Sequence, residues 1–403
     1  MSLFHSLSHR PFALLWAGQT VSRLGDSFYL VALAWWVLVN TGSAAAMGTV
    51  LICESVPLLV FLLVGGVAVD RFPRLYLMLV SDLTRALVVG SVALLAALHL
   101  LQLWHLFVMS ALFGLVDAFF YPAYEAVVPE IVSPEALASA NSLRTIGGNV
   151  SGLAGPALAA SMVALGGTSL AFGIDALTFV LSAGCIMAAS SAAALHRADA
   201  SETGVIQDLR EGIGAVLGSP WVWIGIAVAG VSNITLSGPL DAVLPFLIKL
   251  HLHAGVGIYG LTNSLEAAGS ILVAVWLGHR RQLRHRGPVM YGAWIIAALM
   301  VSAMGLSIGV PGVLLAIFVS GGALGALNLV WANILPVVVP RDLLGRVNSI
   351  DLLGSAGLTP IGLAGAGFAA DRIGPSPVFV IGGAISAGII SLAFLHPAVR
   401  HLD

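Results

Sequence analysis

Charged residues are scarce in this sequence: they make up 9% of its 403 residues, whereas hydrophobic residues make up 59%. Soluble proteins carry roughly 25% charged residues. So few charges cannot cover a surface that faces water, and the composition therefore excludes a soluble globular protein. We expect a chain embedded in a membrane.

Cysteine and lysine are also rare. The two cysteines, Cys53 and Cys185, lie within apolar runs, so no disulfide framework is expected. One lysine stands among sixteen arginines, which argues against a polybasic surface for nucleic acid. The sequence contains no zinc motif of the form His-Glu-x-x-His and no phosphate loop with a lysine, so we expect no metal, no cofactor and no ATP drive.

A serine-hydrolase pattern is present only formally. Gly305, Ser307 and Gly309 have the spacing Gly-x-Ser-x-Gly, but they end an apolar run instead of joining a strand to a helix. We therefore expect no catalytic residues, and we do not expect an enzyme.

Apolar runs of about 20 residues recur along the chain, as in membrane helices, whereas barrel strands alternate over about 10 residues. We predict an all-α membrane protein with twelve transmembrane helices in two pseudo-symmetric halves of six. The predicted spans are 13–38, 44–69, 75–98, 103–128, 143–165, 169–189, 222–247, 257–277, 289–308, 313–339, 347–369 and 378–395. The expected parts are 1–192, a polar linker 193–220 and 221–403, and the later part of 196–219 could form an amphipathic surface helix.

Arginine placement predicts the orientation, because cytoplasmic loops of membrane proteins are rich in Lys and Arg. With an inner amino terminus, thirteen of the seventeen basic residues fall on the inner side. Only Lys249 and Arg372 fall on the outer side, while Arg23 and Arg85 lie within spans. Both termini are therefore predicted to be cytoplasmic, in a multi-pass protein of a prokaryotic plasma membrane.

The two halves also repeat each other. Pro134 and Asn141 precede the fifth span, and Pro340 and Asn348 precede the eleventh. The two asparagines are 207 residues apart (348 minus 141), which is about half the chain. Six spans, a polar linker and six further spans with a parallel repeat match the plan of two-half transporters.

Several short motifs carry a family resemblance. The most charged is Gly66-Val67-Ala68-Val69-Asp70-Arg71-Phe72-Pro73-Arg74, which has the form Gly-x-x-x-Asp-Arg-x-Gly-Arg except that Pro73 replaces the second glycine. The others are Leu15-Trp16-Ala17-Gly18, Ser22-x-x-Gly25-Asp26, Asp82-Leu83-Thr84-Arg85-Ala86, Gly155-Pro156, Ile174-Asp175-Ala176-Leu177-Thr178-Phe179 and Gly345-Arg346-Val347. In order and spacing they resemble the major facilitator superfamily, and within it the drug-efflux branch that includes macrolide and siderophore (enterobactin) exporters.

The resemblance implies the major facilitator fold and secondary active transport. It also implies a cytoplasmic gate that includes Asp70, Arg71 and Arg74, with Asp70 facing the start of the eleventh span near Arg346. A carboxylate is favoured there because a helix start presents free amides and a partial positive charge. The alternative is a solvated turn in which Asp70 pairs with Arg71 or Arg74.

A second copy of the loop pattern ends the eleventh span on the outer side, at Gly367-x-x-x-Asp371-Arg372-x-Gly374. If each half contains inverted three-helix repeats, the second and eleventh spans are pseudo-equivalent. We therefore predict that Asp371 docks on the outer start of the second span, at 41–44, and that Asp371 and Arg372 act as gating residues. The alternative is a solvated helix end.

Ions inside spans are costly unless they are paired or protonated. Arg23 and Asp26 lie three residues apart on one face of the first span and are expected to neutralise each other. Asp82 and Arg85 repeat this spacing in the third span. We interpret the second pair as mainly structural, because the third span of such transporters is usually peripheral. The arginine that many proton-coupled relatives carry in the fourth span is absent, and that span holds Asp117 instead.

Two further acids, Glu54 and Glu266, lie in mid-span without a local base. Carboxyl groups in such surroundings can take up and release protons near neutral pH. The predicted proton-coupling residues are Glu54, Glu266 and Asp26. The equal alternative for each is an acid that stays protonated and bonds to a neighbouring helix.

A substrate is expected to contact side chains of the central spans, although such residues more often face lipid or the core. The substrate-cavity candidates are Arg23, Trp35, Asp117, Phe120, Tyr124 and Trp331. We predict a monomer in the lipid bilayer that exports a drug-like or siderophore-like amphipathic molecule by alternating access, in antiport with protons or with sodium. The alternatives are proton-coupled uptake of a small metabolite and a receptor or channel that does not transport.

Overall fold

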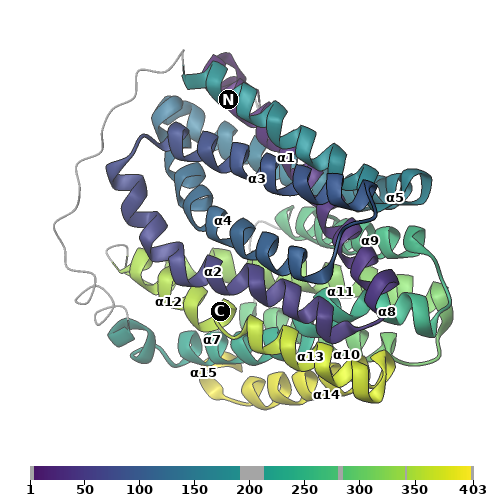
Figure 1. Cartoon of the computed structure of the whole chain (residues 1–403). Helices are drawn as coiled ribbons and strands as arrows, with labels where there is room; N and C mark the ends of the chain where they lie inside the picture. The colour runs from purple at the N-terminus through teal and green to yellow at the C-terminus, as the bar shows by residue number, and fades with distance from the viewer. Residues whose placement is uncertain (1–3, 191–212, 280–284, 341–342, 401–403) are drawn as a thin grey trace. The chain divides into compact units, whose positions relative to one another are not determined.

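The computed structural model describes residues 4–190, 213–279, 285–340 and 343–400 (Figure 1). All regular secondary structure in these ranges is helical. The chain forms two compact units, which we call unit 1 (residues 1–40 and 50–201) and unit 2 (residues 41–49 and 202–403). Most of the predicted amphipathic helix in 196–219 lies outside the described residues.

Unit 1 consists of long helices. They are α1 (Arg10–Thr41), α2 (Ala44–Arg71, from Val50 on), α3 (Arg74–Ala97), α4 (Leu103–Ile131) and α5 (Leu137–Ser190), with short 3₁₀ helices at His5–Ser8 and Pro134–Ala136. Within α5 the backbone leaves the helical conformation at Gly167, with φ of 73° and ψ of −179°. Glycine tolerates this positive φ because it has no Cβ. The break divides α5 into the predicted fifth and sixth spans.

Unit 2 has more interrupted helices. They are α7 (Pro220–Ser232), α8 (Leu244–Phe246), α9 (Val256–Gly278), α10 (Arg286–Met304), α11 (Gly309–Val338), α12 (Leu344–Ala356), α13 (Thr359–Ile373), α14 (Pro375–Phe394) and α15 (Pro397–Arg400), with π-helical segments at Asn233–Val243 and Leu247–His251. The stretch Pro220–His251 forms one continuous span, and so does Leu344–Ile373. Eleven helices in the described residues are long and apolar enough to cross a membrane, and α5 contains two spans. The predicted all-α, twelve-span membrane fold is therefore confirmed.

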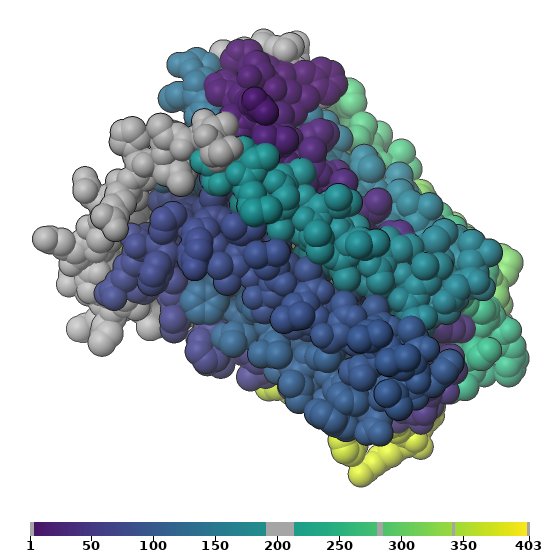
Figure 2. Space-filling view, turned by 45° about the horizontal axis from the view of Figure 1, so that its top comes forward, coloured from purple at the N-terminus to yellow at the C-terminus, as the bar shows by residue number. Residues whose placement is uncertain are grey.

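One face of unit 1, formed by α3 and the later part of α5, exposes large aliphatic side chains. Figure 2 shows the face on which α3 (blue) and the later part of α5 (teal) lie side by side. Leu87 and Leu94 on α3 are 72% and 60% exposed, and Leu177 and Leu181 on α5 are 62% and 61% exposed. Large aliphatic side chains at this density fit a lipid environment and would be unfavourable in water.

Glycine allows α2 and α4 to touch through their backbones. A Cβ at Gly114 of α4 would overlap the backbone carbonyl of Glu54 on α2. Replacing Gly114 with Ala is therefore expected to lower the stability of the protein by about 1–3 kcal/mol, as overpacking typically does. Gly173→Ala is the matched control, because a Cβ there meets open space and Ala is the better helix former. Thermal unfolding of the full chain in detergent checks this, and equal midpoints for the two variants would contradict it.

Candidate functional site

Unit 1 contains a polar cavity of about 300 Å³, lined by residues from α1, α2, α3 and α4. Its charged lining residues are Arg23, Asp26, Glu54, Arg85 and Asp117. Phe120, a predicted substrate-cavity residue, also lines it. The structure thus brings two of the three predicted proton-coupling residues and three of the six substrate-cavity candidates into one site.

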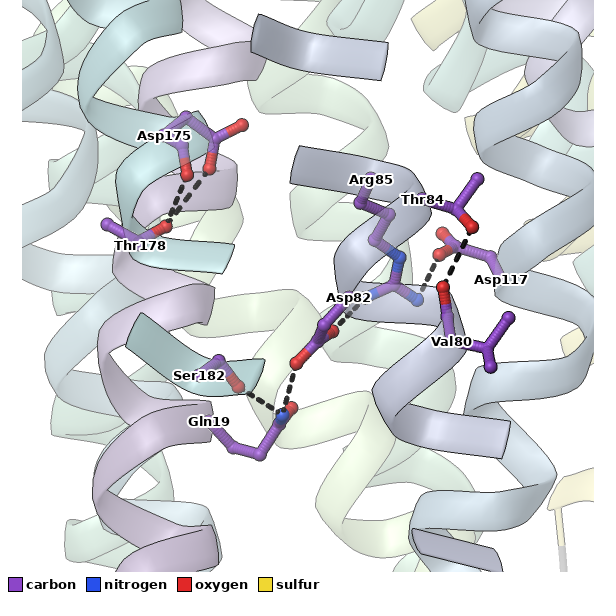
Figure 3. Close-up of polar contacts among 9 residues, drawn as sticks. All are labelled: Gln19, Val80, Asp82, Thr84, Arg85, Asp117, Asp175, Thr178 and Ser182. Atoms are coloured by element: carbon purple, nitrogen blue, oxygen red, sulfur yellow. Dashed lines mark hydrogen bonds and ion pairs between the residues drawn. The ribbon is translucent and has the colours of Figure 1, made fainter. Parts of the chain in front are cut away.

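Arg85 is the centre of this charge cluster (Figure 3). Its guanidinium forms an ion pair with Asp117 of α4 and lies 3.6 Å from Asp82 on its own helix. The guanidinium carbon also lies 4.0 Å from the centre of the Phe120 ring, close enough for a cation–π interaction. Arg85 is 4% exposed and Asp82 is fully buried. A buried cation is tolerated here because carboxylates and an aromatic face surround it.

Asp82 connects the cluster to two further helices. The side-chain amide of Gln19 on α1 donates hydrogen bonds to Asp82 Oδ2 at 3.3 Å and to Ser182 Oγ on α5 at 2.8 Å (Figure 3). Asp175, also on α5, is fully buried, and Thr178 Oγ1 donates to its backbone carbonyl at 2.7 Å. Buried polar contacts therefore hold α1, α4 and α5 around Arg85 on α3.

Asp26 and Glu54 each have a buried carboxylate oxygen without a hydrogen-bond partner among the described residues. These atoms are Asp26 Oδ1 and Glu54 Oε2. No ion pair within 4 Å joins Arg23 to Asp26 in this part of the chain, although the charge of Arg23 acts on Asp26 from a longer distance. The guanidinium of Arg23 lies instead 5.3 Å from the centre of the Tyr124 ring. One turn of helix places the two residues on one face, but packing turns Arg23 toward α4.

Sequence reasoning missed the place of Arg85 in the cavity. We interpreted the Asp82–Arg85 pair as structural because the third span was expected to be peripheral, yet Arg85 lines the cavity and pairs with Asp117. One signal could have found it: the fourth span has an acid and lacks the arginine of related transporters. An unpaired Asp117 in a membrane needs a base from another helix.

Other predicted residues lie elsewhere. Tyr124 is buried in an apolar cluster, where it stacks on Phe120 with ring centres 5.9 Å apart. Trp35 is partly buried and does not line the cavity of unit 1. Trp331 lines a second cavity, of about 340 Å³, within unit 2, where its indole N–H donates to Asp351 Oδ2 at 2.8 Å. Glu266 does not line that cavity.

Glu54 and Glu266 nevertheless occupy matching positions. A Cβ at Gly114 on α4 would overlap the backbone of Glu54 on α2, and a Cβ at Gly321 on α11 would overlap the backbone of Glu266 on α9. Each unit therefore has a glutamate where its second helix crosses its fourth in backbone contact. This equivalence follows from the parallel repeat of the two halves.

The structure places Asp371 on the start of α2, as predicted. Its carboxylate accepts hydrogen bonds from Ser43 Oγ at 2.5 Å, from the Ala44 N–H at 2.7 Å and from the Ala45 N–H at 3.3 Å. These residues all belong to unit 2. The neighbouring Arg372 is exposed, with its guanidinium 5.6 Å from the Phe368 ring centre. The contact is present, and its role in gating stays a prediction.

The loop between α2 and α3 is exposed, as the solvated-turn alternative expects, but within residues 4–190 it lacks the ion pairs of that alternative. Asp70 and Arg71 are exposed, and no ion pair joins Asp70 to Arg71 or Arg74 among the described residues. Arg74 instead pairs with Glu130 of α4 and donates to the Ala126 carbonyl at 2.9 Å. The predicted docking of Asp70 near Arg346 would join the two units, and it stays a prediction.

The helical bundle and its buried polar cavities define a multi-pass membrane protein of the transporter class. The whole chain, residues 1–403, matches a major facilitator family described as "Transmembrane secretion effector", and the chain belongs to that family. It is 25% identical to macrolide efflux protein A of Streptococcus pyogenes over 97% of this chain and 96% of that protein. It is 28% identical to the multidrug efflux pump Tap of Mycolicibacterium fortuitum over 98% of this chain and 97% of that protein.

A solved structure agrees on the fold. The crystal structure of a mutant of the peptide transporter POT superimposes with a TM-score of 0.77 and covers 97% of this chain and 95% of that one. At 12% sequence identity this likeness establishes the fold alone. The predicted membership of the major facilitator superfamily is confirmed by the family match, and the relatives include the predicted macrolide exporters as well as multidrug pumps.

Proposed function

We propose that this protein exports an amphipathic small molecule across the plasma membrane of a prokaryote, in exchange for protons that move inward. The observation that carries the proposal is the cluster of Asp26, Glu54 and Asp117 around Arg85 in the cavity of unit 1. Efflux is favoured as the direction because relatives along nearly the whole chain are named as efflux proteins.

The cluster suggests how protons and substrate compete. Asp117 and Asp82 hold Arg85, so Asp26 and Glu54 have no strong partner of their own. A bare carboxylate in such a site is costly, so each of these acids needs either a proton or a cationic group of the substrate. Binding of substrate then releases protons, and binding of protons releases substrate. Antiport by alternating access requires that substrate and protons do not occupy the site at the same time.

We further propose that carboxylates at helix starts act as gates in this cycle. Asp371, whose docking on α2 is present, would hold the outer side closed, with Arg372 beside it. Asp70, in the loop that also holds Arg71 and Arg74, would do the same on the cytoplasmic side if it docks at the start of the eleventh span near Arg346. With both termini cytoplasmic, the two contacts would alternate during the cycle.

Transport in proteoliposomes tests the proposal. The full-length protein is reconstituted, a pH gradient is imposed, and the fluxes of ethidium and of a radiolabelled macrolide are measured. We expect gradient-driven flux for wild type, at least 10-fold less for Glu54→Gln, and a clear loss for Glu266→Gln, because a glutamine cannot carry the proton. Glu135→Gln, at an exposed position between α4 and α5, is the matched control and should behave as wild type.

Three outcomes would contradict the proposal. Flux that is independent of the gradient in wild type and in both variants would discard proton antiport. Accumulation of the probes together with protons would indicate uptake. If transport requires a sodium gradient instead of a pH gradient, the coupling ion is sodium and not the proton.

A further inference from the structure

The cavity of unit 2 differs in chemistry from that of unit 1. Its walls come from α7 and the π-helical segment after it, and from α10, α11 and α12. Its lining includes two tryptophans, two asparagines, three serines and one aspartate, and no Lys, Arg or His of the described residues lines it. The main polar and aromatic residues are Trp294, Trp331, Asn233, Asn328 and Asp351. Four leucines complete most of the wall, so the cavity combines aromatic and aliphatic surface with uncharged hydrogen-bonding groups and a single carboxylate.

Trp331 is held rigidly in this cavity. Its N–H donates to Asp351 Oδ2 at 2.8 Å, and its ring meets Trp221 edge to face with ring centres 5.5 Å apart. On α7, Gly225 leaves room for the indole, because a Cβ there would lie 2.7 Å from a ring carbon. An aromatic ring fixed by three contacts is a preorganised platform, so a ligand would bind it without the cost of ordering it.

The polar groups around this platform are also oriented. Asn233 donates through its side-chain amide to the Ser355 carbonyl at 2.7 Å and accepts from Ser237 Oγ at 3.4 Å. Asn233 and Ser237 lie in the π-helical segment Asn233–Val243, and π-helical turns often occur at functional sites. Neither the Asn328 side chain nor Asp351 Oδ1 makes a hydrogen bond within the ranges that the structure describes. Both remain able to bond to a ligand.

We propose that this cavity is a binding subsite for a hydroxylated ring, such as a sugar, carried by the transported molecule. The proposal rests on the proposed transport function and adds the class of substrate. The apolar face of such a ring packs on an indole, while carboxamide, carboxylate and serine groups bond to its hydroxyls. Ligand pockets span about 300–1,000 Å³, so a volume of about 340 Å³ suits one small ring rather than a large hydrophobic drug.

Equilibrium binding tests the subsite without any gradient. The full-length protein in lipid nanodiscs is titrated with 4-methylumbelliferone and with its glucoside, galactoside and glucosaminide, and bound ligand is measured by dialysis. We expect at least one glycoside to bind 10-fold or more tightly than the aglycone. The substitution Asn328→Leu should remove that difference. Asn333→Leu, at an exposed position on the same helix α11, is the matched control and should retain it.

The outcomes separate the subsite from the transport proposal. Glycosides that bind no more tightly than the aglycone would overturn the subsite, and so would equal behaviour of Asn328→Leu and Asn333→Leu. If Asn328→Leu fails to fold, Asp351→Asn takes its place, because it keeps the shape of the side chain and removes the charge. Failure of gradient-driven flux with intact glycoside binding would reject antiport and leave the subsite standing.

Discussion

Replacing Arg85 with Gln is expected to abolish gradient-driven transport and to destabilise the protein by about 3–5 kcal/mol, the usual cost of removing one partner from a buried ion pair. The variant would leave Asp117 and Asp82 without their cation in a site where Arg85 is 4% exposed. Both acids would then compete with Asp26 and Glu54 for protons. Protonation of Asp26 and Glu54 would no longer be coupled to the binding and release of substrate. Flux in proteoliposomes and thermal unfolding in detergent measure the two effects.

Two further variants separate the effect of Arg85 on stability from its effect on transport. The double variant Arg85→Gln with Asp117→Asn should recover part of the lost stability, because it removes the stranded charge, but it should not recover transport. Arg23→Gln should cost much less stability, since Arg23 forms no ion pair with Asp26 among the described residues and faces the Tyr124 ring. Wild-type flux in the Arg85→Gln protein would show that the cluster is structural, as the sequence alone had indicated.

Replacing Asp371 with Ala is expected to open the first turn of α2 about 10-fold more often. The carboxylate accepts bonds from Ser43 and from the N–H groups of Ala44 and Ala45. A hydrogen bond to a charged group contributes roughly 1.5–3 kcal/mol, and less at an exposed position such as this one. Amide hydrogen exchange of residues 44–47 measures the opening directly. The same variant should shift the protein toward the outward-open state in a labelling assay of the outer side.

Arg372→Gln is the matched control for this prediction. Arg372 is the neighbour of Asp371, but its guanidinium lies over Phe368. Amide hydrogen exchange at residues 44–47 of the Arg372→Gln variant should therefore match that of the wild-type protein. Unchanged exchange in Asp371→Ala would mean that the contact does not stabilise the helix start. Faster exchange with unchanged accessibility would mean that the contact is real but is not a gate.

The contrast between Asp371 and Arg85 shows what sequence reasoning can reach. The docking of Asp371 could be predicted because two copies of one motif, combined with inverted repeats, relate the second span to the eleventh. That relation depends on symmetry alone, and symmetry is visible in the order of motifs. The partner of Arg85 could not be predicted in the same way. Asp82, three residues away, satisfied the local spacing rule, whereas Asp117 lies on another helix.

The same limit applies to Arg23 and Trp331. Arg23 has a carboxylate one turn away, yet it turns toward Tyr124 on another helix. Trp331 was chosen only as an aromatic residue in a central span, and the orientation of its ring depends on Asp351, Trp221 and Gly225 from two other spans. In each case the local rule gives a set of possible partners, and packing between helices selects one of them.

Composition and motif order alone establish that this protein is helical, crosses the membrane twelve times and repeats its own plan, because hydrophobic length and repetition are properties of the chain. They also identify most of the acids that line the cavity of unit 1, because a charged residue within an apolar span is easily recognised in the sequence. The packing of the helices was needed to show which acids share a cavity, that Arg85 is the cation they surround, and that unit 2 has a tryptophan-lined pocket. Such sites are assembled from helices far apart in the chain, and each helix takes its rotation about its own axis from the neighbours it packs against.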